Sequence, residues 1–384
     1  MPGAAPAPLS ILDLSPVSEG SSVGAALRNT IDLARRAESF GYHRYWVAEH
    51  HFTPGVASSS PAVLIGAIAA ATSAIRVGSG AVQLGHQTPA AVVEAFGTLA
   101  ELYPGRIDLG IGRSGKRRAK ERGEHGPVRG QDEAPATGPR TENGLLIPPP
   151  FSSAYLMRTP RFKAQSALLQ QPEAQTPDFG EQVDDILALL HGTYSSAGIG
   201  IEATPGTGTD PEFWVLGTSG GQSAQVAGAL GLPFAASYHI TPATTIEAAE
   251  SYRAAFRPSA VLPAPYVMVS ADAVVAETDA RAQELAAGYG LWVRSIRSGA
   301  GAMRYPSAAA AAAFRWTGED RALVEDRVST QFAGSPQTVA KHLRILQDAT
   351  AADEVLVTGI THRHEDRVRS FELLAREWGA APRL

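Results

Sequence analysis

Short apolar runs with the character of strands alternate with longer helical runs along most of this chain of 384 residues. Between residues 42 and 115, three such runs stop in polar or glycine-rich residues. Parallel strands joined by helices bring their carboxyl ends to the same edge of a sheet. The alternation therefore predicts an α/β protein with its chemistry at that edge.

Eight runs have the length and composition of strands. Helical runs separate them; some begin at a proline, and the first ends at Gly41, as a helix C-terminus commonly does. A closed (β/α)8 barrel, also called a TIM barrel, and a doubly wound open sheet share this alternation, and the number of strands favours the barrel. The predicted strands are residues 9–14, 45–49, 75–83, 107–111, 213–216, 234–237, 266–276 and 354–357.

The chain is longer than one barrel requires, since a barrel takes about 250 residues. The strand and helix pattern is lost at about 114–177, after strand four, and at 291–327, after strand seven. The first stretch is basic and proline-rich, and the second, which contains the alanine run Ala308–Ala313, stands where a lid would cover the barrel mouth. We predict a single domain over 1–384 with two long insertions.

Composition excludes several classes of protein. With 44% hydrophobic residues, 18% charged residues and a net charge of −5, the chain is neither disordered nor polycationic, which argues against a nucleic-acid partner. The absence of cysteine excludes disulfides, thiolate metal sites and cysteine nucleophiles. No basic leader and no run of about 20 apolar residues is present, so we expect a cytoplasmic protein without a membrane partner.

The stretch Gly110–Gly115 matches G-x-G-x-x-G directly after a strand. A nicotinamide-binding fold would continue into an apolar helix and then a strand that ends in an acidic residue about 20 residues later. Here the following residues are strongly charged and show no strand. We interpret the glycines as a tight turn at the barrel rim.

A glycine-rich turn, Gly217–Ser223, follows the fifth strand and leads directly into a helix. Backbone N–H groups at a helix N-terminus favour an anion such as phosphate, and Arg113 at the end of the neighbouring strand would add a guanidinium. The alternative is an ordinary turn in which Thr218 or Ser219 caps the helix. The candidate anion-binding residues are Arg113, Gly217, Thr218, Ser219, Gly220 and Gly221.

The adjacent histidines His50 and His51 follow the second strand. Successive strand residues point to opposite sides, so one of the two at most faces the barrel axis, which weakens a two-histidine metal site. Asp13 is a candidate further ligand, and His362 and His364 are more consistent with solvated loop residues, so we predict no metal. A single inward histidine is better suited to donate or accept a proton.

Several segments together resemble the bacterial luciferase-like, flavin-dependent monooxygenases. The resemblance covers roughly residues 8–115 and 210–290, with a weaker match in Phe332-Ala-Gly-Ser-Pro336. The segments are Asp13-Leu-Ser-Pro16, Glu19-Gly-Ser21, Gly41-Tyr-His-Arg-Tyr-Trp-Val-Ala-Glu-His-His51, Val77-Gly-Ser-Gly80, Tyr103-Pro-Gly-Arg-Ile-Asp-Leu-Gly-Ile-Gly-Arg113 and Gly231-Leu-Pro-Phe-Ala-Ala-Ser237.

The resemblance implies a barrel that binds reduced FMN (FMNH2), supplied by a separate flavin reductase, and uses O2 to oxidise a small organic substrate, with secondary metabolism as one setting. It implies a homodimer and a proton-transfer role for His50. It places the phosphate between Arg113 and the turn at 217–221. It also places a non-proline cis peptide at Gly80–Ala81, beneath the flavin ring.

One departure concerns Gly112, which stands where light-emitting luciferases have a reactive cysteine, so the resemblance does not extend to light emission. Trp46, Val82 and Phe234 are either an apolar lining of the site or plain core. The alternatives in function are deazaflavin-dependent hydride transfer, a phosphate-binding isomerase or lyase, and a non-catalytic flavin-binding protein.

Overall fold

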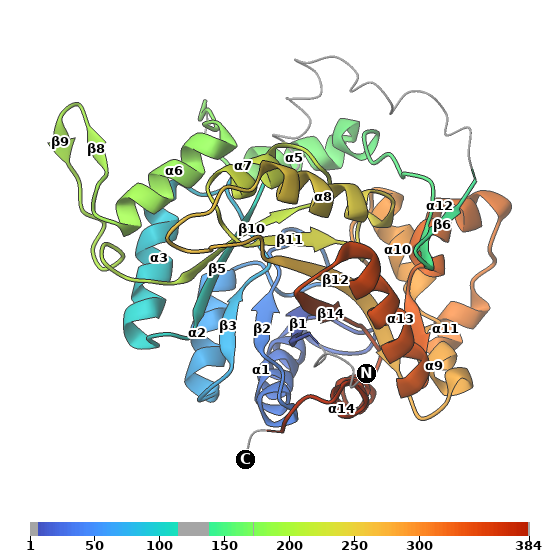
Figure 1. Ribbon diagram of the computed structural model, residues 1–384. Coiled ribbons are helices and arrows are strands. Elements are labelled where there is room, and N and C mark those ends of the chain that lie inside the picture. Colours follow the sequence, from blue (N-terminus) through green and yellow to red (C-terminus); the bar gives the residue numbers. More distant parts are fainter. Residues whose placement is uncertain (1–6, 114–137, 172, 383–384) are drawn as a thin grey trace.

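The computed structural model describes residues 7–113, 138–171 and 173–382. Eight parallel strands form a closed ring, because β10 pairs with β5 as well as with β11, and β1 pairs with β14 (Figure 1). The predicted (β/α)8 barrel is therefore confirmed. In ring order the strands are β1 (Leu9–Asp13), β2 (Arg44–Val47), β3 (Arg76–Ser79), β5 (Ile107–Gly112), β10 (Glu212–Gly217), β11 (Phe234–Ser237), β12 (Val267–Val275) and β14 (Glu354–Thr358).

Helices surround the ring, one for each strand. The first, α1, begins after Ser22, whose hydroxyl accepts a hydrogen bond from the Ala25 N–H, and ends at Gly41 with a φ of 89°. Pro61 and Pro89 occupy the first turns of the next two helices, as predicted. The helices are α1 (Val23–Phe40), α2 (Pro61–Ala71), α3 (Pro89–Leu102), α6 (Phe179–Leu190), α7 (Gln222–Ala229), α8 (Thr245–Ala255), α13 (Pro336–Thr350) and α14 (His364–Trp378).

Two tryptophans fill the middle of the barrel. The rings of Trp46 and Trp214 meet edge to face, with centroids 5.3 Å apart. Glycines are their register partners on the neighbouring strands, Gly78 beside Trp46 and Gly110 beside Trp214. A Cβ on Gly78 would lie 2.9 Å from Trp46 Cδ1, so this glycine makes room for the ring. The prediction that Gly110 and Gly112 form a rim turn is wrong, because both lie within β5, and residue 115 is outside the described residues.

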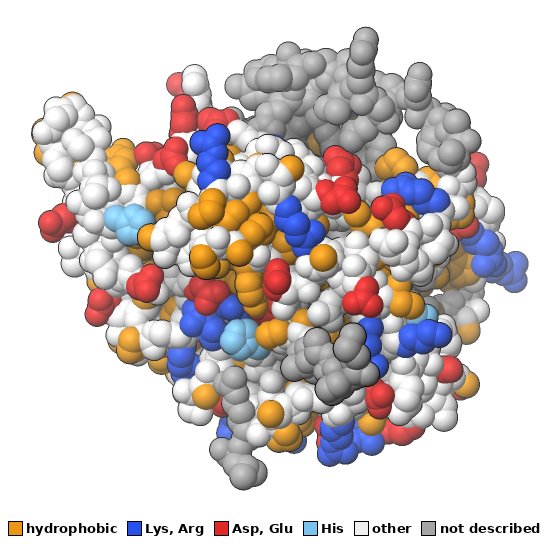
Figure 2. All heavy atoms as spheres, in the orientation of Figure 1, with side chains coloured by type: hydrophobic (Ala, Val, Ile, Leu, Met, Phe, Trp, Pro, Cys, Tyr) orange, Lys and Arg blue, Asp and Glu red, His pale blue; other side chains and the backbone are white. Residues whose placement is uncertain are grey.

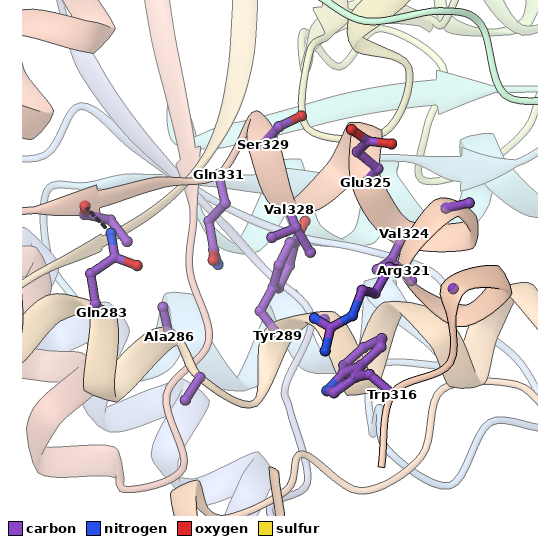
Figure 3. A pocket seen from close by; sticks show the side chains of 15 residues that line it. Gln283, Ala286, Tyr289, Trp316, Arg321, Val324, Glu325, Val328, Ser329 and Gln331 are labelled. Atoms are coloured by element: carbon purple, nitrogen blue, oxygen red, sulfur yellow. Dashed lines mark hydrogen bonds between the residues drawn. The ribbon is translucent and has the colours of Figure 1, made fainter. Parts of the chain in front are cut away.

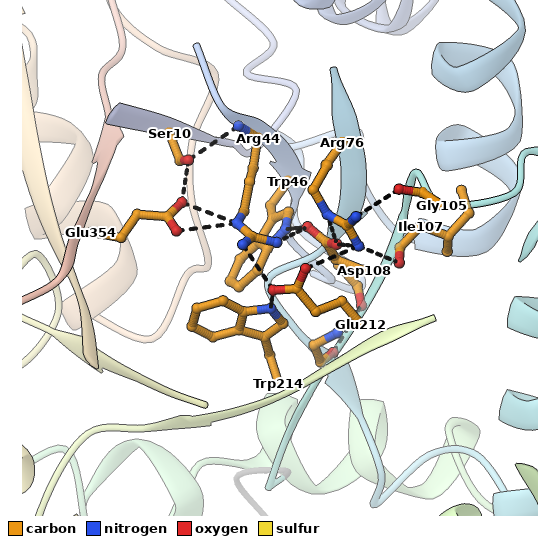
Figure 4. A network of polar contacts seen from close by, with 12 residues as sticks. Ser10, Arg44, Trp46, Arg76, Gly105, Ile107, Asp108, Glu212, Trp214 and Glu354 are labelled. Atoms are coloured by element: carbon orange, nitrogen blue, oxygen red, sulfur yellow. Dashed lines mark hydrogen bonds and ion pairs between the residues drawn. The ribbon is translucent and has the colours of Figure 1, made fainter. Parts of the chain in front are cut away.

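A charged layer closes the amino end of the barrel (Figure 4). The guanidinium of Arg44 pairs with Asp108 at 3.0 Å, Glu212 at 2.8 Å and Glu354 at 3.1 Å, and Arg76 pairs with the first two of these. Burial raises the pKa of Asp108 and of Glu354 in spite of Arg44. Because this network of paired side chains occupies the amino end, we expect a ligand to enter at the carboxyl end.

The long insertions contain more regular structure than the sequence predicted. The described part of 114–177 holds a hairpin and a helix, and a second, unpredicted hairpin follows α6. The third predicted strand is broken after Ser79. The further elements are β4 (Val82–Gln83), β6 (Arg140–Glu142), β7 (Leu145–Ile147), η1 (Leu156–Arg158), α5 (Pro160–Leu168), β8 (Ser195–Ser196), β9 (Ile199–Gly200) and η2 (Pro242–Thr244).

The insertion after β12 is largely helical, where the sequence indicated only an alanine run. Its helix α10 inserts apolar side chains into the core cluster that fills the barrel, including Tyr289 and Trp292. Ion pairs between Arg294 and Asp320 and between Arg297 and Asp326 fasten α10 to α12. The elements are α9 (Asp279–Ala286), α10 (Tyr289–Arg297), α11 (Ala308–Ala313), α12 (Gly318–Ser329) and β13 (Phe332–Gly334), which pairs with β12.

Charged side chains of both signs are scattered over the face of the molecule drawn in Figure 2. The described residues on that face form no large area of a single sign, so they offer no basic stripe of the kind that binds a nucleic-acid backbone. Within the described ranges, no helix combines the length and apolar character that crossing a bilayer requires.

Candidate active site

His50 lies at the carboxyl end of the barrel, three residues beyond β2. It continues the inward series of Arg44, Trp46 and Ala48, whose side chains lie inside the ring, and its backbone N–H is fixed by the Ser58 carbonyl at 2.8 Å. Its side chain is exposed to solvent although protein atoms crowd around it. This crowding lowers the pKa of His50 to about 4, so the imidazole is neutral at pH 7.

The neighbouring residues point elsewhere, as strand alternation predicts. Glu49 is buried, and one carboxylate oxygen accepts from the Gln83 N–H at 2.9 Å while the other lies 2.8 Å from His51 Nε2. The ring of His51 also meets that of His86 edge to face, 5.6 Å between centroids. His50 is therefore the one histidine of the pair that stands at the axis.

The side chains considered for a metal site do not converge. Asp13 lies outside the ring, where its carboxylate binds Arg367 at 2.6 Å and Tyr45 at 2.5 Å. His362 contacts the Glu19 carbonyl, and His364 contacts Asp32. Asp13 is therefore not a metal ligand, and no group of three or more candidate ligands occurs in the part of the chain that the structure describes.

The peptide bond between Gly80 and Ala81 is cis, as the resemblance predicted. Gly80 packs against the barrel core, because a Cβ there would lie 2.8 Å from Leu12 Cδ1. Gly112, on the adjacent strand, is different: a Cβ there would meet only Ala81 Cβ at 3.4 Å and the Leu216 carbonyl oxygen at 4.0 Å. Glycine and alanine thus line this part of the inner wall with little side-chain bulk.

Arg113 lies beside the glycine-rich turn between β10 and α7, because β5 and β10 are neighbouring parallel strands. Its Nη1 is 3.5 Å from Gln222 Oε1, and its Nη2 is 3.8 Å from the place that a Cβ of Gly221 would take. The structure therefore brings together the guanidinium and the turn that the sequence predicted to be adjacent.

The residues of the turn have distinct surroundings. Gly221 is the N-cap of α7, and no side chain caps this helix, so the alternative in which Thr218 or Ser219 caps it is wrong. The Thr218 carbonyl accepts hydrogen bonds from Thr241 and Thr244. Helix N-termini without a side-chain cap are suited to an anion.

Two other glycines of the turn serve close packing. A Cβ on Gly217 would lie 2.7 Å from Phe234 Cε2, and one on Gly220 would lie 2.3 Å from Ser251 Oγ. Neither position tolerates a side chain without movement of its neighbours. These two glycines shape the turn, whereas Gly221 faces Arg113.

Of the two interpretations of Trp46, Val82 and Phe234, the structure supports plain core for all three. Phe234 lies outside the ring, stacked on Tyr252 of α8 at 5.2 Å, and Val82 is 1% exposed within the outer core. Trp46 does lie inside the ring, but it is fully buried and donates to Asp108 at 2.8 Å. Trp46 is therefore part of the barrel core.

The sequence did not reveal a polar cluster on the opposite wall. His239 lies within electrostatic reach of His50, its Nδ1 is 2.6 Å from Ser270 Oγ, and burial, with Arg327 and His50, lowers its pKa to about 3. Asp272 of β12 accepts from Gln331 Nε2 at 2.8 Å. If the strand alternation of β11 is continued past Ser237, His239 points into the barrel, so the sequence did contain a signal for this residue. Gln331 and Arg327 come from the insertion after β12, where no strand pattern predicts the direction of a side chain.

A cavity of about 680 Å3 lies between α9, α10, α12 and β13 (Figure 3). Its lining includes Trp316, Arg321 and Glu325, together with Tyr289 and Gln331, which both bind Asp272. None of the residues predicted to bind a cofactor lines this cavity. The cavity is therefore distinct from the site around His50 and Arg113.

The family model of the luciferase-like monooxygenases matches residues 8–142 and 162–353. The chain belongs to this family, and it is an enzyme of the flavin-dependent monooxygenase class. The uncharacterised protein YvbT of Bacillus subtilis is 39% identical over 371 residues, which is 96% of each chain. A luciferase-like monooxygenase of Escherichia coli is 35% identical over 95% of each chain.

Solved structures share the architecture. The crystal structure of apo-MsnO8 matches with a TM-score of 0.76 and 34% identity, over 98% of this chain and all of the other. A type II Baeyer-Villiger monooxygenase from a plasmid of Pseudomonas putida, solved in complex with FMN, matches with a TM-score of 0.62. At 19% identity over 99% of each chain, this second likeness shows the fold alone.

Proposed function

We propose that this enzyme is a two-component monooxygenase that binds reduced FMN at the carboxyl end of the barrel and uses O2 to oxidise an organic substrate. The observation that carries the proposal is the position of Arg113 beside Gly221, at the N-terminus of α7. A guanidinium and the backbone N–H groups of a helix N-terminus are complementary to a phosphate.

The inner wall supports the placement of the flavin ring. Gly80, Ala81 and Gly112 offer a surface with little side-chain bulk, reached from the mouth at which Arg113 stands. A relative with the same fold was solved with FMN, which is a precedent for this cofactor in such a barrel. The residues present therefore fit FMN, with its phosphate between Arg113 and residues 217–221.

Reduced FMN, when bound, supplies the electrons with which oxygen is activated. The protein orients the cofactor through Arg113 and admits it between walls of small residues. His50, neutral at pH 7, accepts or donates a proton at a ring nitrogen close to the mouth. A separate flavin reductase as the source of reduced FMN, and a homodimer as the assembly, are further parts of this proposal.

The test is a comparison of FMN with riboflavin, which lacks the phosphate. We expect Arg113→Ala to weaken FMN binding by about 10- to 100-fold, the strength of a charge-assisted hydrogen bond, and to leave riboflavin binding nearly unchanged. Arg140→Ala is the matched control, because Arg140 is an exposed arginine that pairs with Glu142. Equal weakening of both flavins would remove the phosphate assignment.

Catalysis needs a second measurement. Photoreduced FMN and the enzyme are mixed without oxygen, oxygen is then admitted, and the return of oxidised-flavin absorbance is timed. A time course identical to that of free reduced FMN would contradict the monooxygenase proposal. Tight binding of a deazaflavin without oxygen consumption would favour hydride transfer, and FMN binding without substrate-dependent oxygen consumption would indicate a non-catalytic flavin protein.

A further inference from the structure

Three buried polar atoms near the carboxyl ends of β12 and β14 have no hydrogen-bond partner in the described part of the chain. They are Trp292 Nε1, Tyr305 OH and Thr358 Oγ1, on side chains of residues that are 4%, 0% and 2% exposed. A buried donor left without an acceptor costs free energy, so native proteins rarely leave several in one place. Each of these three groups can donate a hydrogen bond.

Two of these groups, those of Thr358 and Tyr305, lie near one carboxylate, that of Asp272, and the third, that of Trp292, belongs to a ring that packs on Tyr289 beside it. Thr358 is the register partner of Asp272 on the neighbouring strand, so both side chains point into the barrel. Burial, and then Asp272 and Tyr289, raise the pKa of the Tyr305 hydroxyl, which places it within electrostatic reach of that carboxylate. The ring of Trp292 stacks on that of Tyr289, 6.3 Å between centroids.

Asp272 is already engaged. Gln331 Nε2 donates to it at 2.8 Å, and the Tyr289 hydroxyl donates to it as well. Three donors without a described partner thus lie in one subsite, which we define as Asp272, Tyr289, Trp292, Tyr305, Arg327 and Thr358. A donor-rich buried site is complementary to a ligand rich in acceptors.

Arg327 adds a positive charge to the same subsite. Its Nε and Nη2 donate to the Tyr289 hydroxyl at 3.2 Å and 2.8 Å, and the side chain is half-buried. Arg294 and Arg297 of the facing helix α10 both pair with carboxylates, but Arg327 has no ion-pair partner among the described residues. A half-buried guanidinium bonded only to a phenol is suited to an anionic ligand.

We propose that this subsite binds the carboxylate of an organic-acid substrate, with Arg327 as its counter-ion and the Tyr305 and Thr358 hydroxyls as hydrogen-bond donors. This inference rests on the proposed function and names the class of its substrate. Strand β11 separates β12 from β10 on one side of the ring, and β1, β2 and β3 separate β14 from β5 on the other. The acid group is thus held away from the phosphate turn beside Arg113.

Asp272 carries the same charge as the proposed ligand unless it takes up a proton. Burial raises the pKa of Asp272 to about 6, against the opposite effects of Gln331, Arg327 and Tyr289. We therefore expect a carboxylate to bind more tightly at pH 6 than at pH 8. The charged and titratable groups that act on Asp272 in this subsite are Arg327, Tyr289, Tyr305 and Arg367.

The test uses the flavin-free enzyme with hexanoate as the probe and hexanamide, which has the same carbon chain but no charge, as its counterpart. Binding is measured by calorimetry and by the shift in Tm. We expect hexanoate but not hexanamide to bind, and Arg327→Gln to weaken hexanoate by at least about tenfold. Arg315→Gln, an exposed arginine of the same insertion, is the matched control and keeps full binding.

Two further variants keep the test decisive if Arg327→Gln does not fold. Tyr305→Phe and Thr358→Val remove hydroxyls that have no partner, so we expect the Tm of the free enzyme to hold or rise while hexanoate binding weakens several-fold. Equal binding of hexanoate and hexanamide, or unchanged hexanoate binding in these variants, overturns the inference. The inference is also overturned if Arg113→Ala loses hexanoate binding while the variants of Arg327, Tyr305 and Thr358 keep it. None of these outcomes bears on FMN, because no flavin is present.

Discussion

Arg44 and Glu354 are 310 residues apart in the chain, and their side chains form an ion pair of 3.1 Å at the amino end of the barrel (Figure 4). The same guanidinium contacts Asp108 and Glu212, so one residue of β2 links side chains from β5, β10 and β14. A contact set of this kind forms only when the ring is closed.

We expect Arg44→Met to lower the free energy of unfolding by about 3–5 kcal/mol, because it leaves buried carboxylates without their counter-ion. Urea unfolding followed by circular dichroism measures this loss. Arg36→Met is the control, since Arg36 forms an exposed pair with Asp32 at 3.6 Å and should change stability by less than about 1 kcal/mol. A similar small effect of Arg44→Met would contradict the structural role of the network.

Replacement of Gly110 or Gly112 of β5 by alanine should lower the stability of the enzyme to different extents. Gly110→Ala places a Cβ 2.0 Å from the Ser79 carbonyl oxygen, so the backbone must shift, and we expect a loss of about 3 kcal/mol. Gly112→Ala meets its nearest neighbour at 3.4 Å, and we expect a change below about 1 kcal/mol. Thermal unfolding of the two variants side by side tests the contrast, and equal losses would count against it.

Asp272 should give the stability of the enzyme a distinct pH dependence. Its folded-state pKa, about 6, is above the ordinary value of 3.8, so between these values the folded state holds a proton that the unfolded state has released. The contribution of Asp272 to the free energy of unfolding is therefore greatest below about pH 4. It decreases by up to about 3 kcal/mol as the pH rises through 6. Asp272→Asn should remove this loss, so its stability relative to the parent enzyme should rise from pH 4 to pH 7 in urea titrations. A constant difference would contradict the raised pKa.

His50 should act without titrating near neutrality. If it transfers a proton, His50→Gln should lower kcat by about 100-fold while FMN binding stays nearly unchanged. Because crowding lowers the pKa of His50 to about 4, protonation of this ring should not reduce the activity of the parent enzyme between pH 7.5 and 5.5. The pH dependence of kcat/KM checks this. An acidic limb near pH 6.5 that disappears in His50→Gln would show that the ring is not as crowded as the structure indicates.

The local pattern of residues in the sequence was enough to predict the order of the strands and helices and several of their ends. Strand and helix order, the proline-led starts of α2 and α3 and the left-handed end of α1 at Gly41 depend on neighbours within a few residues. The placement of Arg113 beside the turn at 217–221 followed from one additional inference, that consecutive strands of a barrel are adjacent. The cis peptide at Gly80–Ala81 came from resemblance to a family.

Only the tertiary structure decided which side chains meet across the ring. Phe234 belongs to the outer core, where it stacks on Tyr252 of α8, and Trp46 belongs to the inner core, where it meets Trp214. Both are aromatic residues in short apolar strands, so composition alone did not separate them. The polar subsite depends on Arg327, Tyr305 and Asp272, which are separated by long stretches of an insertion with no strand periodicity. Sequence pattern reports local propensity, whereas contacts of this kind depend on ring closure and on how the insertion packs over it.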